Sequence, residues 1–132
     1  LFDFLKVMPE AKIFGMDISK YAIANSKEEI KSNLIVGDAA NLPYEDNFFD
    51  LVISINTLHC LEAPQLYKAL KEMERVGKDK KYLCVESYRN EVEKANLLYW
   101  QVSCEAFNTP SEWNWWFHLA GYSGDYSFIY FE

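Results

Sequence analysis

The sequence contains no apolar run that approaches the ~20 residues a membrane-spanning helix needs, and no signal-peptide pattern opens it. It also lacks a Cys-x-x-Cys pair, since Cys60, Cys84 and Cys104 lie far apart in the chain. An odd number of dispersed cysteines offers no metal framework and is typical of a reducing cytoplasm. We therefore expect a cytoplasmic protein with no bound metal and no membrane partner.

Basic residues are also scarce. The 13 lysines and arginines are outnumbered by 20 aspartates and glutamates, which gives a net charge of −7. Binding to nucleic acid needs a basic surface that neutralises phosphates, so this balance predicts no nucleic-acid partner. With 50% hydrophobic and 25% charged residues, the 132-residue chain has the composition of one globular domain that buries a core.

Predicted strands and helices alternate along the chain. Apolar, β-branched runs predict strands at residues 12–17, 34–37, 49–55, 82–86 and 126–131. Apolar residues at helical spacing predict helices at residues 1–8, 20–30, 64–76, 91–107 and 110–120. This alternation predicts one doubly wound α/β domain with a mostly parallel sheet, and the helix at about 91–107 is an insertion into it.

The chain opens inside a predicted helix. Leu1, Leu5 and Met8 fall at helical spacing, and no capping residue precedes Leu1. A helix that feeds a parallel strand is normally preceded by another strand. We therefore expect this chain to be a fragment of a longer protein.

Two acids follow predicted strands at the positions where parallel sheets bind ligands. Asp17 closes the run at 12–17, and Asp38 follows the run at 34–37. Two carboxylates at two strand ends favour a ligand that carries hydroxyls and an amine. The local alternatives are a helix-capping role for Asp17 and an Asx-turn at Asp38.

Three segments resemble one protein family. Residues 15–19 (Gly-Met-Asp-Ile-Ser), 37–43 (Gly-Asp-Ala-Ala-Asn-Leu-Pro) and 49–59 (Phe-Asp-Leu-Val-Ile-Ser-Ile-Asn-Thr-Leu-His) are similar to class I S-adenosylmethionine-dependent methyltransferases. The likeness is closest to the small-molecule methyltransferases with a Gly-Asp-Ala-x-x-Leu-Pro signature. It implies a Rossmann-like fold and methyl transfer from S-adenosyl-L-methionine to a small-molecule acceptor. The family's first strand and glycine-rich loop, which precede these segments, have no counterpart here, so the resemblance also implies an N-terminal truncation.

The resemblance further implies a cofactor site at the ends of three strands. Its residues are Asp17, Ile18, Asp38, Ala39, Leu42, Asn56 and Leu58. In this arrangement Asp17 accepts hydrogen bonds from the ribose hydroxyls, Asp38 accepts one from the adenine amine, and apolar side chains enclose the ring. His59 is the one nearby side chain that could act as a base at neutral pH, although a lone histidine is more often structural.

Two other functions stay open at this stage. Acids at successive strand ends also fit a dinucleotide-dependent oxidoreductase, and Tyr67 and Lys71 have the Tyr-x-x-x-Lys spacing of short-chain dehydrogenases. The segment before them, however, lacks that family's Asn-Ala-Gly-like turn. The other alternative is a non-catalytic, methyltransferase-like remnant. Without the glycine-rich loop, we expect the 132-residue chain alone to bind S-adenosylmethionine poorly.

Overall fold

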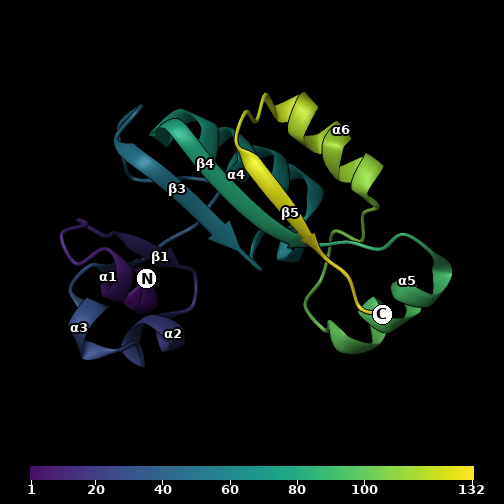
Figure 1. The fold of residues 1–132 in the computed structure, drawn as a ribbon, viewed down its shortest axis with the longest axis horizontal. Helices are drawn as coiled ribbons and strands as arrows, with labels where there is room; N and C mark the ends of the chain where they lie inside the picture. The colour runs from purple at the N-terminus through teal and green to yellow at the C-terminus, as the bar shows by residue number, and fades with distance from the viewer.

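Two parallel β-sheets, joined by residues 37–48, organise the molecule (Figure 1). The computed structural model describes residues 1–132. One sheet pairs β1 (Gly15–Asp17) with β2 (Leu34–Val36). The other has the order β3 (Phe49–Ile55), β4 (Gly77–Glu86), β5 (Asp125–Ile129), and both of its pairings are parallel.

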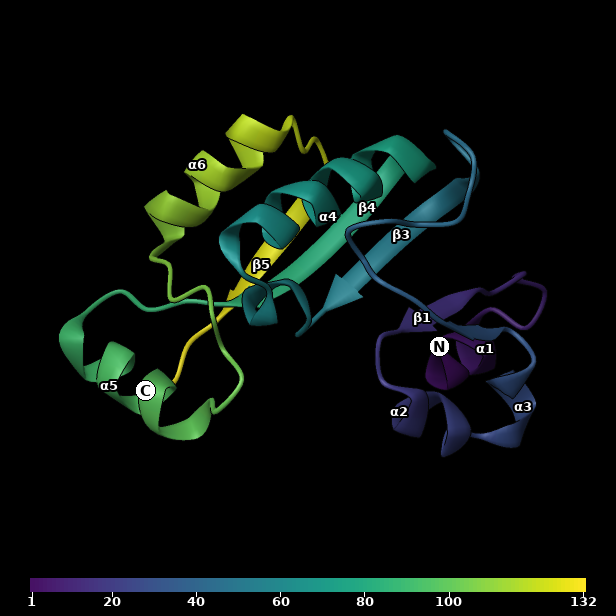
Figure 2. The same ribbon diagram turned by 180° about the vertical axis from the view of Figure 1, so that it is seen from behind.

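The helices divide between the two sheets (Figures 1 and 2). Three short helices accompany the two-stranded sheet: α1 (Phe2–Val7), α2 (Lys20–Ala24) and α3 (Glu28–Lys31). Helices α4 (Ala63–Val76) and α6 (Pro110–Ala120) pack on the three-stranded sheet. Helix α5 (Glu91–Trp100) lies beyond the ends of the strands of this sheet, and a 3₁₀ turn, η1 (Leu58–Cys60), follows β3. No helix has both the length and the apolar character needed to cross a bilayer.

The main core lies between α4, α6 and one face of the three-stranded sheet. Its eleven buried residues are Leu58, Leu66, Ala69, Leu70, Met73, Leu83, Val85, Trp113, Phe117, Ala120 and Tyr122. The rings of Trp113 and Phe117 stack with centroids 5.8 Å apart, and the Trp113 indole N–H donates to the Glu86 carbonyl over 2.9 Å. Burying each large apolar side chain contributes about 1.5–3 kcal/mol.

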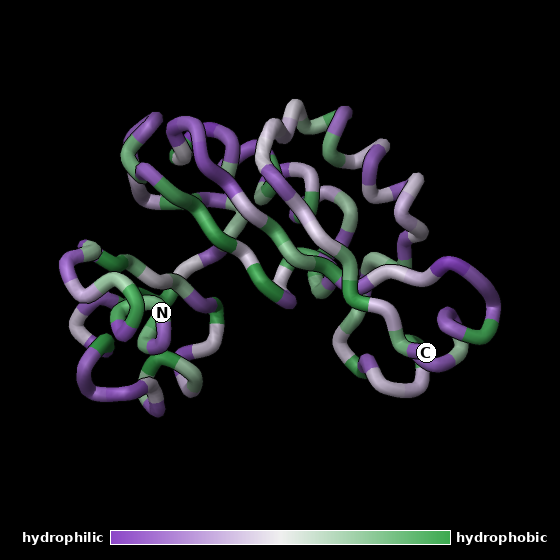
Figure 3. Tube along the Cα trace, in the orientation of Figure 1, coloured by the Kyte–Doolittle hydropathy of each residue, from purple (hydrophilic) through white to green (hydrophobic).

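The opposite face of β3 is uncovered. Side chains alternate along a strand, so Val52 packs against the core while Leu51, Ile53 and Ile55 point away from it and are 40%, 45% and 57% exposed. Figure 3 shows the hydrophobic colour along much of this strand. Because β3 pairs only with β4, its other edge also has no strand partner. An apolar edge strand of this kind is a template for a further strand.

The predicted parallel α/β fold is confirmed, but several element bounds were wrong. The helix expected at 20–30 is two short helices, because the side chains of Asn25 and Ser26 donate to the carbonyls of Tyr21 and Ile23 and compete with helix continuation. The strand expected at 12–17 forms its ladder only over β1.

Two corrections concern the C-terminal half. The inserted helix expected to reach residue 107 ends at Trp100, because the backbone N–H groups of Glu105 and Ala106 both donate to the His59 carbonyl. β4 begins at Gly77 rather than at residue 82, although its first half is rich in lysine. Lys81 is buried there because its ammonium donates to Glu74 and to a backbone carbonyl.

The predicted ends of the last helix are confirmed. Thr109 and Glu112 form the expected capping box, and Gly121 follows the helix in the left-handed region at φ 70°. β5 then runs over residues 125–129, two residues shorter than the expected strand at its C-terminal end.

Candidate cofactor site

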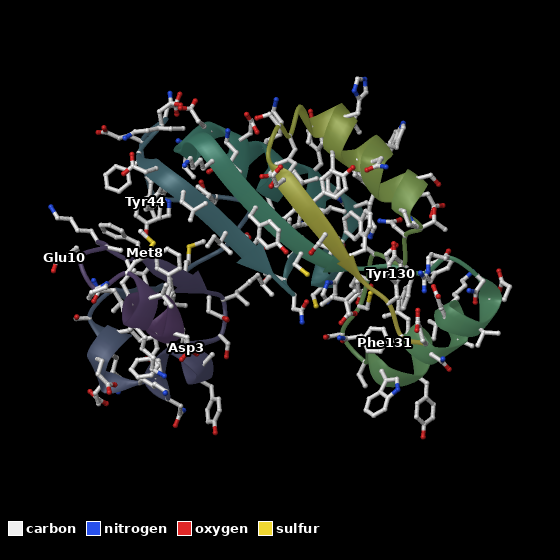
Figure 4. The ribbon with its side chains drawn as sticks, in the orientation of Figure 1. Asp3, Met8, Glu10, Tyr44, Tyr130 and Phe131 are labelled. Atoms are coloured by element: carbon white, nitrogen blue, oxygen red, sulfur yellow. The ribbon has the colours of Figure 1, made fainter.

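A cavity of about 730 Å³ runs between the facing strands β1 and β3. Eighteen of the 22 residues that line it are hydrophobic, and its polar side chains are Asp17, Ser54 and Thr57. All three lie at or just beyond the carboxyl end of a strand. Small-ligand sites are likewise mostly apolar with a few polar groups. Tyr44, which also lines the cavity, lies between the two halves of the molecule (Figure 4).

One carboxylate oxygen of Asp17 is free of hydrogen bonds. Its Oδ1 accepts a hydrogen bond from the Ser19 N–H over 2.8 Å, while Oδ2 makes no hydrogen bond. The Ser19 hydroxyl in turn accepts from the Ala22 N–H and caps α2. The capping work is therefore done by Ser19, and the carboxylate of Asp17 at the wall of the cavity keeps an oxygen for hydroxyl donors.

The Asp38 side chain forms the Asx-turn that the sequence allowed as the alternative to a ligand role. Its Oδ1 accepts from the Ala40 N–H over 2.8 Å, and the side chain is exposed outside the lining of the cavity. Ala39 and Leu42, on the same loop, do line the cavity. The loop after β2 thus contributes its apolar residues to the cavity wall, with the Asp38 carboxylate beside them.

The structure brings together four of the seven predicted cofactor residues, namely Asp17, Ala39, Leu42 and Leu58. Asp38, Ile18 and Asn56 lie outside the lining, and Ile18 is 75% exposed. Asn56 has φ 54°, a left-handed conformation that turns the chain sharply after β3.

His59 does not reach the cavity. Its side chain is 1% exposed, and its Nε2 lies 3.5 Å from a carboxylate oxygen of Glu86, which is 2% exposed. The other ring nitrogen accepts from the Glu86 N–H over 3.4 Å, which places the proton of the neutral ring on Nε2. Burial lowers the pKa of His59 and raises the pKa of Glu86. These contacts make His59 a buried partner of Glu86 rather than a base open to an acceptor.

The structure also places residues that the sequence reasoning did not single out. Ser54 and Thr57 line the cavity near the end of β3. In the sequence, they could have been found as polar residues at the end of an apolar run. Tyr67 and Lys71, in contrast, are both exposed on α4 and lie outside the cavity, so their dehydrogenase-like spacing has no counterpart in a site.

Parallel strands joined by helices, with a cavity that reaches the carboxyl ends of the strands, are the arrangement of Rossmann-like α/β proteins. Within this class, the chain belongs to the methyltransferase domain family, whose model matches residues 1–121. The demethylmenaquinone methyltransferase of Bacillus mycoides (strain KBAB4) is 36% identical over 85 residues, which cover 59% of this chain and 35% of that protein.

Two further similarities extend over more of the chain. The tRNA (carboxymethyluridine(34)-5-O)-methyltransferase of Arabidopsis thaliana is 33% identical over 96 residues, or 72% of this chain and 24% of that protein. A chain of the solved complex between the Haloferax volcanii Trm112 methyltransferase activator and the putative methyltransferase has a TM-score of 0.67 at 22% identity, over 91% of this chain and 55% of that one. The chain thus spans about a third or less of these two curated relatives.

Proposed function

We propose that the protein containing this chain transfers a methyl group from S-adenosyl-L-methionine to a small-molecule acceptor. The observation that carries the proposal is the cavity between β1 and β3, with the free carboxylate oxygen of Asp17 at its polar end. Membership of the methyltransferase domain family supports the same reaction. The bound cofactor would supply an activated methyl on a sulfonium, so the protein's part is alignment and exclusion of water.

In this proposal, different residues contact the ribose, the adenine and the methyl end of the cofactor. Asp17 accepts from the ribose hydroxyls through Oδ2, and Ala39 and Leu42 provide the apolar wall for the adenine. Asp38, beside that wall, accepts from the adenine amine through the oxygen its turn leaves free. Ile18 covers the outer side of the ring. Asn56 and Leu58, which follow β3, lie nearest the methyl end.

The acidic charge favours a small-molecule acceptor over a nucleic acid. One relative is named for demethylmenaquinone and another for a tRNA, so the relatives' names include both kinds of acceptor. The net charge of −7 on this chain supports the small-molecule acceptor, because tRNA binding requires a basic surface. We also infer a cytoplasmic location, which is supported by the free state of all three cysteines. Burial raises the pKa of Cys104 to about 12 and keeps it an unreactive thiol.

The unpaired edges of β1 and β3 support a further part of the proposal. An interior strand of the full-length protein lies between them and completes one continuous sheet, since backbone groups of apolar strands need partners. This strand fills the apolar length of the cavity, and the loop after it holds the amino-acid end of the cofactor. The 132-residue chain alone is therefore expected to bind S-adenosylmethionine weakly, and micromolar affinity for it would contradict this part.

Calorimetric titration of the full-length protein with S-adenosylmethionine tests the main proposal. Asp17→Ala removes the charged acceptor for the ribose hydroxyls and is expected to weaken binding by about 1–3 kcal/mol. Asp79→Ala is the matched control, because Asp79 is an exposed aspartate of β4 outside the cavity. Equal affinity of the Asp17→Ala variant and the wild type would refute the assignment.

A further inference from the structure

The loop that joins the two sheets is held by one pair of side chains on α4. The carboxylate of Glu72 accepts from the Leu42 N–H over 2.7 Å, and the guanidinium of Arg75 donates to the Leu42 carbonyl over 3.0 Å. Both backbone groups of a residue that lines the cavity are therefore fixed by the same helix. Glu72 and Arg75 are also bonded to each other, with nitrogen–oxygen distances of 2.7 Å.

Arg75 binds the loop at further points. Its guanidinium donates to the Tyr44 carbonyl over 2.7 Å and to the Asp46 carboxylate over 2.9 Å, and its own carbonyl accepts from the Asn47 N–H over 2.8 Å. A planar guanidinium with donors in a fixed fork is suited to holding several oxygens at once. The hydrogen bond from Arg75 lowers the pKa of Glu72, so both partners stay charged at neutral pH.

The held loop connects the two sheets through an aromatic cluster. The Tyr44 ring lies 4.7 Å from the Phe49 ring at the start of β3 and 6.0 Å from the Phe14 ring just before β1. Phe14 and Phe49 also contact each other at 5.6 Å. No strand of one sheet pairs with a strand of the other, and this cluster and its loop join the two. Figure 4 shows Tyr44 in that position.

We propose that Glu72 and Arg75 are a positioning pair, which fixes the loop after β2 and so keeps Ala39 and Leu42 in place at the wall of the cavity. Neither side chain lines the cavity, so they act through the loop and not on the ligand. That this placement serves cofactor binding rests on the function proposed above. In the 132-residue chain the same pair also holds the two sheets in place, and this part does not rest on the proposed function.

The mechanical part is tested without any ligand. In the 132-residue chain, spin labels are introduced as non-natural amino acids at Lys20 on α2 and Asn114 on α6, which are exposed and belong to different halves. Arg75→Met removes the guanidinium group but keeps a side chain of similar length. This variant is expected at least to double the width of the label–label distance distribution. It should also speed exchange of the Leu42 amide hydrogen at least tenfold. An unchanged distribution and unchanged exchange would overturn the proposal.

Two variants keep this test decisive. Arg89→Met is the matched control, because Arg89 binds two carboxylates, Glu93 and Glu132, at the far end of the molecule, and its loss should alter neither measurement. Glu72→Gln retains the acceptor for the Leu42 amide but removes the charge that fixes Arg75. It should broaden the distribution less than Arg75→Met, and it replaces that variant if Arg75→Met fails to fold by circular dichroism.

The ligand part uses S-adenosylmethionine and the full-length protein. Arg75→Met is expected to raise the dissociation constant at least tenfold, Arg75→Lys to restore part of the loss, and Arg89→Met to leave it unchanged. Wild-type affinity in Arg75→Met, despite a broadened label distribution, would overturn the positioning role. If the wild type itself binds no S-adenosylmethionine, the proposed function fails, and the label distances alone decide whether the pair holds the sheets.

Discussion

Replacing His59 with phenylalanine perturbs the most deeply buried ionisable pair in the structure. The imidazole faces Glu86, whose second carboxylate oxygen accepts from the Gln101 side chain. Without His59, the glutamate is still 2% exposed but retains only the Gln101 partner. Because this histidine is neutral, its loss is that of a buried polar partner and not of an ion pair, and we expect it to cost about 1–3 kcal/mol at pH 8.

The loss of unfolding free energy in His59→Phe should depend on pH in a defined direction. Burial lowers the pKa of His59 from its ordinary 6.5, so its stabilising effect is present above that value and is lost as pH falls through the lowered pKa. Burial raises the pKa of Glu86 from its ordinary 4.5, so its effect is present below that value and is lost as pH rises through the raised pKa. The two effects oppose each other in the wild type. His59→Phe keeps only the second, so its deficit grows from pH 5 to pH 8.

Urea unfolding between pH 5 and pH 8, followed by tryptophan fluorescence, measures this deficit. The double variant His59→Phe/Glu86→Gln also removes the Glu86 carboxylate that the single variant leaves without His59. It should recover part of the stability, with a flatter pH dependence than the single variant. A deficit that is independent of pH, or single-variant losses that add within ~0.5 kcal/mol in the double variant, would refute the assigned pairing.

Two further predictions concern the last helix and are also read by urea unfolding. Trp113→Ala removes a fully buried side chain that stacks on Phe117, and should cost about 3–5 kcal/mol, whereas Trp115→Ala, at a residue 56% exposed, should stay within ~0.5 kcal/mol of wild type. Thr109→Ala removes the N-terminal cap and should cost about 1 kcal/mol. Equal effects at the two tryptophans, or no effect at Thr109, would contradict the packing and capping described above.

Local signals in the sequence predicted the fold well where one residue type dictates the conformation. The capping box at Thr109 and the left-handed glycine at 121 follow from backbone chemistry, and the apolar run of β3 from its β-branched residues. The errors arose where distant contacts override local pattern. The helix after Asn90 stops early because His59, some forty residues before the loop that follows it, accepts two backbone hydrogen bonds from that loop.

The same limit applies to the candidate site. The sequence predicted acids at strand ends, and Asp17 does line the cavity. It did not reveal that His59 is turned toward Glu86, since the direction of a side chain after a strand depends on the buried group it meets. Nor did it reveal Arg75, whose partners lie about thirty residues earlier in the chain. Such long-range hydrogen bonds leave no periodic trace in a single sequence.

A crystal structure of the full-length protein with S-adenosyl-L-homocysteine would locate the cofactor relative to Asp17. We expect the adenosine at the polar end of the space between β1 and β3, with both ribose hydroxyls within about 3 Å of the Asp17 carboxylate, a hydrogen-bonding distance. We also expect the adenine against Ala39 and Leu42. An adenosine bound elsewhere, with Asp17 still engaged only by Ser19, would contradict this placement.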